Sequence, residues 1–241
     1  MGSSPIRALL VASLVALVTV GTASAAGVNG RLVLGAYKPE PPKPKRSPFN
    51  WELENGFKQV IPDRVDAARE LAVVLVGEGE APGLDRAEAV FQGGGLLPST
   101  IVARTGATLL VRNEDEVAHE VYAAKLDAFA SEAISPRGRR TVKLDAAGDW
   151  ALADKLIPHV KGHLHVVDNL IAIAKVDASG RFSFADVAPG KYTLKVFHGP
   201  KEVGSSAVEV AGTKAITLDP MTLTTGPAEG GGEGAPAEKA K

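Results

Sequence analysis

The chain contains five histidines and no cysteine, and three of the histidines lie close enough in sequence to bind one metal ion. His163 and His165 are two residues apart in an apolar segment, and on a β-strand their side chains would share one face. His159 precedes His163 by four residues, across a bend that contains Pro158 and Gly162. Neutral imidazoles at such spacing bind Cu(II), Ni(II) or Zn(II). This segment is therefore a candidate metal site.

The composition excludes several other kinds of chemistry. The absence of cysteine removes disulfides, thiolate zinc sites, iron–sulfur clusters and cysteine nucleophiles. Lys+Arg 27 against Asp+Glu 28 gives a formal net charge of -1, which does not favour a nucleic-acid partner. The sequence also has no Gly-x-Ser-x-Gly motif of the kind that presents a catalytic serine. We therefore predict that the protein is not an enzyme and does not bind nucleic acid.

The elements that carry these residues are predicted to be short strands. Gly 26, Pro 16 and only 5% aromatic residues indicate a chain with many turns. Between residues 87 and 167, apolar segments alternate with turns at the spacing of a β-sandwich. The expected strands are residues 89–91, 100–103, 108–112, 116–123, 141–144, 150–153 and 164–167. Residues 172–196 contain two more alternating segments separated by turns, which predicts a β-meander.

The N-terminal residues 1–25 have the three zones of a cleavable signal peptide. Arg7 precedes an apolar run at 8–20, and a small-residue end follows at 23–25. The run is shorter than the roughly 20 residues that a spanning helix needs, so we predict no transmembrane anchor after cleavage. The expected location is periplasmic, extracellular or at the cell surface.

Two further segments are predicted to lie outside any core. The Pro-rich basic insertion at 37–48 contains five prolines and four basic residues, which favour an extended surface loop or arm. Alternatively, this arm contacts an anionic envelope polymer or an acidic partner protein. Residues 223–241 are rich in Gly, Ala, Pro, Glu and Lys without periodicity and are expected to be a disordered tail.

The segment 87–167 resembles the cupredoxin family, the Greek-key β-sandwich of plastocyanin-like proteins. The residues that carry the resemblance are Gln92, Leu97-Pro98, Gly106, Leu110 to Asp115, His119-Glu120-Val121, Phe129, Gly148-Asp149-Trp150 and Gly162. The resemblance places the first copper-binding histidine at His119. It places the copper-binding cysteine at Asp154, the second histidine at Ile157 and the methionine at Val160. Since three of the four ligands are absent, a type 1 copper centre is excluded.

A thiolate-free site is the alternative that these residues leave open. A type 2 copper or zinc site could use His119, His159 and one of His163 or His165, with Asp154 as a further oxygen ligand. In the opposite interpretation, His119 packs in an empty site and the other histidines are polar residues at a sheet surface. The main prediction is therefore a protein without a cofactor, and the alternative is one that binds copper or zinc.

A second resemblance covers the remainder of the chain. Val176 to Phe182 and Pro189 to Val196 resemble the carboxypeptidase regulatory-like, prealbumin-like β-domain. Val28 to Leu34 and Leu71 to Val76 look like the opening two strands of the same domain. We therefore expect a prealbumin-like β-sandwich made of residues 26–86 and 168–222, with the cupredoxin-like domain inserted between them. In this domain His198 is expected to be structural.

These observations predict an exported, non-enzymatic binding or scaffold protein of the bacterial cell envelope, with an envelope protein or polymer as its unknown partner. Copper or zinc binding at the histidines is the first alternative. Envelope polysaccharide binding is the second, and the small number of aromatic residues for stacking on sugars makes it weaker.

Overall fold

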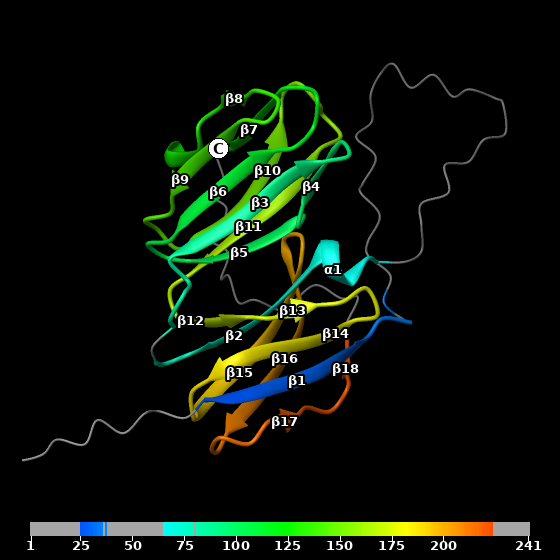
Figure 1. Ribbon diagram of the computed structural model, residues 1–241, viewed down its shortest axis with the longest axis vertical. Coiled ribbons are helices and arrows are strands. Elements are labelled where there is room, and N and C mark those ends of the chain that lie inside the picture. The colour runs from blue at the N-terminus through cyan, green and yellow to red at the C-terminus, as the bar shows by residue number, and fades with distance from the viewer. Residues whose placement is uncertain (1–24, 36, 38–64, 80, 224–241) are drawn as a thin grey trace, which may run out of the picture.

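The computed structural model describes residues 25–35, 37, 65–79 and 81–223 of the chain, and Figure 1 shows their arrangement. Of the predicted signal peptide, only Ala25 lies in this part, and of the predicted tail only Leu223. The proline-rich insertion at 37–48 also lies outside the described residues, except for Tyr37. None of the helices in the described ranges is long and apolar enough to cross a membrane.

Residues 86–167 form a first β-sandwich, in the upper half of Figure 1. One sheet has the order β4-β3-β6-β9, with β3 (Arg86–Gln92), β4 (Gly95–Leu97), β6 (Thr108–Asn113) and β9 (Arg139–Lys143). The other has the order β5-β11-β10-β7-β8, with β5 (Thr100–Arg104), β7 (His119–Ala123), β8 (Glu132–Ile134), β10 (Gly148–Asp154) and β11 (Lys161–Val167). A short 3-10 helix, η1 (Asp127–Phe129), lies between β7 and β8. The core between these sheets contains Phe91, Leu109, Phe129 and Leu164.

The strand expected at 116–123 begins only at His119, because Asn113 holds the preceding residues in a turn. Its side-chain oxygen accepts a hydrogen bond from the N–H of Asp115 at 3.0 Å, and its amide donates to the carbonyl of Val117 at 2.8 Å. Asparagine side chains commonly stabilise turns in this way.

The second sandwich combines strands from both ends of the described chain. One sheet has the order β12-β2-β15-β16, with β2 (Leu71–Gly77), β12 (Leu170–Ile173), β15 (Gly190–His198) and β16 (Lys201–Val210). The other has the order β13-β14-β1-β17, with β1 (Ala26–Val33), β13 (Lys175–Val176), β14 (Arg181–Val187) and β17 (Ile216–Thr217), and β18 (Met221–Thr222) also pairs with β1. A single turn of helix, α1 (Ala67–Glu70), precedes β2. The prediction of an all-β fold built from sandwiches is confirmed.

The expected β-meander at 172–196 is wrong. β14 pairs with β1 and β13, whereas β15 pairs with β2 and β16, so the two consecutive strands belong to opposite sheets. The reason is that both strands direct large apolar side chains into one core, Phe182 and Phe184 from β14 and Leu194 and Val196 from β15. Two strands can bury such faces against each other only from opposite layers.

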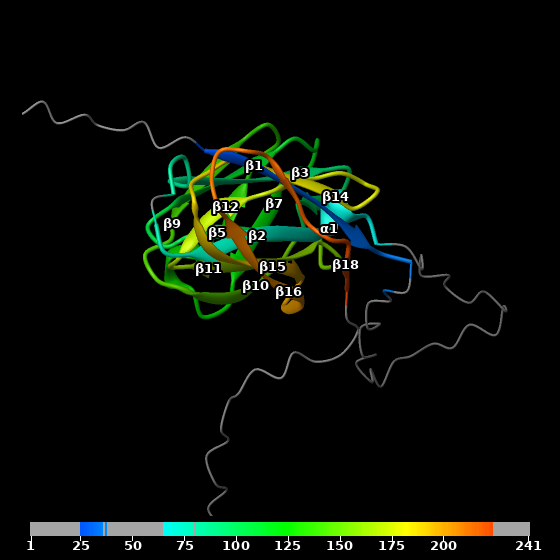
Figure 2. The same ribbon diagram turned by 90° about the horizontal axis from the view of Figure 1, so that it is seen from below.

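The two sandwiches are stacked along the long axis of the molecule, as Figure 1 and the view from below in Figure 2 show. Strand β2 is buried on both faces, which explains its continuous apolar sequence. Leu71, Val73 and Leu75 belong to the core of the second sandwich. The alternate residues Ala72, Val74 and Val76 belong to a separate apolar cluster with Val102 of β5, Leu170 of β12 and Phe197 of β15. We call the contact around this cluster the junction of the two sandwiches.

Candidate functional site

The structure places His119 on one face of a sheet and His163 and His165 on the opposite face. On β7, His119 faces the core of the first sandwich and stacks on Phe91, with ring centroids 4.0 Å apart. On β11, Leu164 and Val166 belong to that core, so the alternate residues His163 and His165 face outward. The expectation that His119 and the later histidines form one site is therefore not met. Residues on opposite faces of a sheet cannot reach a common ion.

His119 is fully buried between two carboxylates. Its Nδ1 lies 2.7 Å from Oδ2 of Asp154, and its Nε2 lies 3.2 Å from Oδ2 of Asp115. Asp115 also accepts hydrogen bonds from the N–H groups of Gly93 and Gly94, at 2.6 and 3.0 Å. These contacts occupy both nitrogen atoms of the ring with protein partners.

Both carboxylates are held in their charged form. Burial acts to raise the pKa of Asp154, but hydrogen bonds from His119 and from the backbone N–H groups of Ile157, Glu120 and Leu156 outweigh it, and the pKa lies below its ordinary value. Burial likewise opposes the ionised form of Asp115, while the two glycine N–H groups and His119 lower its pKa overall. The group around His119 is a hydrogen-bonded network of one imidazole and two carboxylates.

The residues at this end of the sandwich do not fit a type 1 copper centre. Asp154, at the position that the resemblance assigns to the cysteine, contacts the histidine directly instead of presenting sulfur to a metal ion. Ile157 and Val160, at the positions of the second histidine and the methionine, are apolar, and Val160 belongs to the core. We derive no copper chemistry from this end.

His159 lies in the exposed connection between β10 and β11. Among the described residues, neither His159 nor His119 belongs to a group of three histidine, aspartate or glutamate side chains with converging ligand atoms. The structure therefore does not assemble the predicted site from His119, His159 and a later histidine, nor does it present Asp154 as a ligand beside them.

The structure does bring together Asp149, His163 and His165, which we call the junction triad. Their potential ligand atoms all lie within 4.8 Å of one another. Asp149 of β10 is the direct cross-strand partner of His165 of β11, and directly paired residues share a face of the sheet. His163 lies two residues from His165 on that face, and the two imidazole centroids are 4.6 Å apart. Two adjacent strands thus position all three side chains.

His163 supplies an imidazole nitrogen without a partner. The residue is 8% exposed, and its buried Nε2 has no hydrogen-bond partner among the described residues. Burial is the main cause that lowers the pKa of His163 to about 4, and the nearby His165 adds to the effect while Asp149 opposes it. At neutral pH the ring is uncharged, which is the form that binds metal ions.

The other two members of the triad, His165 and Asp149, supply the two further potential ligands. Nε2 of His165 donates a hydrogen bond to the carbonyl of Gly199 at 2.7 Å, and Nδ1 contacts the carboxylate of Asp149. In metal sites the ligand histidine almost always donates its second N–H to such a carbonyl or carboxylate, which fixes the tautomer. The Asp149 side chain is 66% exposed, so the triad is accessible from solvent.

Asp149 is the member of the triad that sequence reasoning did not identify as a candidate ligand. The sequence marks Asp149 only as part of Gly148-Asp149-Trp150, one of the segments that carry the cupredoxin resemblance. Its pairing with His165 depends on the register of β10 and β11. The connection at 155–160 contains no regular element, so the sequence does not predict this register.

His198 also lies close to the junction. Its Nδ1 is 2.8 Å from the hydroxyl of Tyr37, and its Nε2 is 3.3 Å from Oε2 of Glu70. The hydrogen bond with His198 is the main cause that lowers the pKa of Glu70. The contacts of His198 therefore join β15 to the segment before β2.

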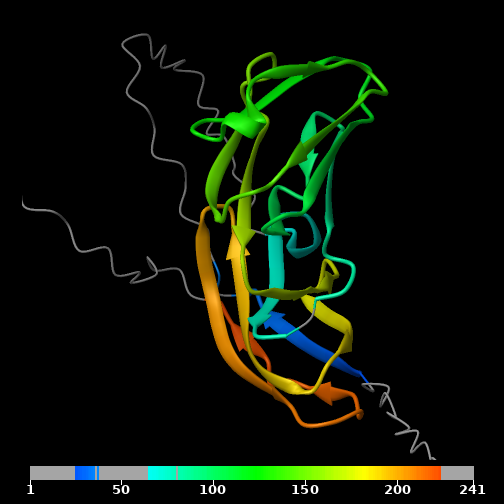
Figure 3. The same ribbon diagram turned by 90° about the vertical axis from the view of Figure 1, so that its left-hand side faces the viewer.

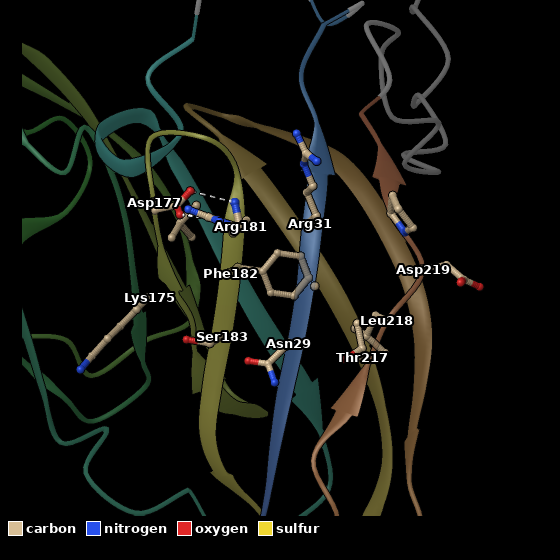
Figure 4. A pocket seen from close by; sticks show the side chains of 13 residues that line it. Asn29, Arg31, Lys175, Asp177, Arg181, Phe182, Ser183, Thr217, Leu218 and Asp219 are labelled. Carbon is tan, nitrogen blue, oxygen red and sulfur yellow. Dashed lines mark hydrogen bonds and ion pairs between the residues drawn. The ribbon is translucent and has the colours of Figure 1, made fainter.

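A groove of about 760 Å³ crosses the outer face of the sheet β13-β14-β1-β17 (Figure 4). Arg31, Lys175 and Arg181 line it together with Asp177 and Asp219, and Arg181 forms an ion pair with Asp177 at 2.8 Å. Among the described residues that line the groove, the one aromatic side chain is that of Phe182, which is 4% exposed. These residues therefore offer no exposed ring for stacking on a sugar.

Comparisons with known proteins find similarity at the level of fold only. No family model matches the chain, and no curated protein matches it. Among solved structures, amicyanin from Paracoccus versutus has 17% identity and a TM-score of 0.32 over 39% of this chain and 97% of its own. A purple cupredoxin from Nitrosopumilus maritimus has 15% identity and a TM-score of 0.31 over 34% of this chain and 99% of its own.

A third similar structure is the copper-containing nitrite reductase of Thermus scotoductus, with 15% identity and a TM-score of 0.32. That match covers 35% of this chain and only 23% of the reductase. The prealbumin-like character of the second sandwich stays a prediction.

Proposed function

We propose that this is an exported, non-enzymatic protein that binds one divalent transition-metal ion, Cu(II) or Zn(II), at Asp149, His163 and His165. The observation that carries the proposal is the convergence of one potential ligand atom from each of these three side chains within 4.8 Å, and it is supported by the buried Nε2 of His163, which has no hydrogen-bond partner in the described part of the chain. A buried polar atom left unpaired costs about 1–3 kcal/mol, and coordination to a metal ion would remove this cost.

The donor atoms indicate which ions the triad would accept. Two imidazoles and one carboxylate suit Cu(II) and Zn(II), whereas Cu(I) prefers thiolate and thioether ligands. None of the three members contains sulfur. Three protein ligands leave a coordination position for water or for a group from a partner.

Export and the absence of catalysis belong to the same proposal. The three zones of residues 1–25 support a signal peptide, and the cell envelope is then the compartment in which the metal would be met. Storage, sensing or transfer of the ion to an envelope partner needs no catalytic group. A metal-free binding or scaffold role for the two sandwiches is the second candidate, and the hydrogen-bonded network that occupies both nitrogens of His119 favours it.

The test is a metal titration of the mature chain without an affinity tag, since added histidines would mask the native ones. We expect one Zn²⁺ or Cu²⁺ per chain in elemental analysis, with an affinity that His163→Ala lowers by at least about tenfold. His159→Ala is the matched control, because this exposed histidine is outside the triad. Equal affinities of the two variants, or no binding to the wild-type chain, would overturn the proposal and leave the scaffold role.

A further inference from the structure

We propose that a metal ion at the junction triad strengthens the contact between the two sandwiches, so that metal occupancy sets how firmly they are joined. This inference rests on the proposed function. It follows from the position of His165, which takes part both in the triad and in the junction.

His165 contacts the second sandwich at the turn between β15 and β16, which points toward the first sandwich (Figure 3). The carbonyl of Gly199 in this turn accepts the hydrogen bond from Nε2 of His165 at 2.7 Å. The N–H of the same residue donates to the hydroxyl of Thr100 at 2.7 Å. Thr100 in turn donates to the carbonyl of Glu70 at 2.6 Å. Two side chains of the first sandwich therefore hold both polar groups of one residue of the second.

The ring of His165 also packs on the second sandwich. It stacks on Phe197, with centroids 4.3 Å apart and an angle of 29° between the planes. Phe197 belongs to the apolar cluster of the junction. A movement that separates the sandwiches would therefore remove the stacking contact and the hydrogen bond to Gly199 together.

Metal binding and a closed junction favour each other for two physical reasons. A metal ion on Nδ1 of His165 makes Nε2–H a stronger donor and fixes the tautomer that donates to Gly199. A bound ion also restricts the ring of His165 to one orientation, and in the closed junction this ring stacks on Phe197 of the second sandwich. Ordering of the ring by the metal therefore favours the closed state.

The coupling must act in both directions. If Zn²⁺ favours the closed junction over the open one by a given factor, the closed junction binds Zn²⁺ more tightly than the open one by the same factor. A change that opens the junction therefore lowers the affinity for Zn²⁺. Thr100 is suited to test this, because it bonds to the N–H of Gly199, whereas His165 bonds to the carbonyl, and it is not a member of the triad.

The first experiment measures amide hydrogen exchange of residues 197–201 in the full chain with and without Zn²⁺. We expect Zn²⁺ to slow exchange in this turn by about fivefold or more in the wild-type chain and to have no effect in His163→Ala. Stoichiometric Zn²⁺ binding without slower exchange would overturn the coupling but leave the proposed function intact. No Zn²⁺ binding would overturn both.

The second experiment measures the Zn²⁺ affinity of Thr100→Val. Valine keeps the shape of the side chain but removes the hydroxyl that bonds to both Gly199 and Glu70. We therefore expect the affinity for Zn²⁺ to fall by about fivefold or more. Thr105→Val is the matched control, since its hydroxyl bonds to Asp168 and not to the turn. A folded Thr100→Val protein in which residues 197–201 exchange faster than in the wild-type chain, but which keeps the wild-type affinity for Zn²⁺, would overturn the proposal.

Discussion

Nδ1 of His119 lies 2.7 Å from Oδ2 of Asp154, and both residues are buried in the first sandwich. The cupredoxin resemblance assigns these two positions to the first histidine and the cysteine of a copper centre. In this chain the two side chains contact each other directly, and Asp115 pairs with the second nitrogen of the ring. Hydrogen-bonded side chains thus occupy the end of the sandwich where the resemblance places a metal.

Removal of Asp154 is expected to destabilise the fold without affecting metal binding. Asp154→Ala leaves a buried imidazole without its nearest carboxylate, which should cost on the order of 3 kcal/mol in the free energy of unfolding by urea. Asp149→Ala on the same strand removes an exposed carboxylate and should cost less than about 1 kcal/mol. Similar losses for the two variants would contradict a structural role for the network, as would a loss of Zn²⁺ binding in folded His119→Ala.

The network should also make stability depend on pH. The pKa values of Asp115 and Asp154 are lower in the folded chain than their ordinary value. Their stabilising effect is therefore complete above the unfolded pKa of about 3.9 and is lost as the pH falls through the folded value.

The measurement is the difference in unfolding free energy between the wild-type chain and Asp115→Asn across pH 3–7. We expect this difference to be constant above about pH 5 and to shrink toward pH 3, because the Asp115 carboxylate of the unfolded wild-type chain takes up a proton before that of the folded chain. A difference that stays the same through this range would show that the charge of Asp115 does not stabilise the fold.

Asp149 should be required for tight metal binding although it contributes little to stability. Asp149→Asn keeps the size of the side chain but removes the charge that faces His165, and we expect the affinity for Zn²⁺ to fall by at least about tenfold. Asp145→Asn is the control, because Asp145 is an exposed aspartate in the connection before the same strand. Competition with a chromophoric chelator measures both affinities, and equal values would exclude Asp149 as a ligand.

Gly30 tests the pairing of the N-terminal strand with the C-terminal part of the chain. Gly30 of β1 lies opposite Phe182 of β14, and a Cβ atom at this position would overlap the phenylalanine ring. Gly30→Ala should lower the free energy of unfolding by about 1–3 kcal/mol, and Phe182→Leu should be less harmful in that variant than alone. Gly35→Ala has open space around its Cβ and serves as the control. An unchanged urea midpoint for Gly30→Ala would contradict this pairing.

Several features of the protein follow from the sequence alone. Short apolar segments between turns predict the all-β fold, and the absence of cysteine by itself excludes a thiolate site. The spacing of His163 and His165 places them on one face of a strand, and the apolar run at 71–76 indicates a buried strand. These are local properties, because the two-residue period of a strand and the chemistry of a side chain need no distant partner.

The tertiary structure decided which of these residues meet. Alternation shows that His163 and His165 share a face, but it does not show that this face lies outside the first core while His119 lies inside it. The pairing of Asp149 with His165 depends on the register of two strands, and the contact of His165 with Gly199 joins residues of different sandwiches. Such long-range contacts depend on the packing of whole sheets, and no pattern within one segment encodes them.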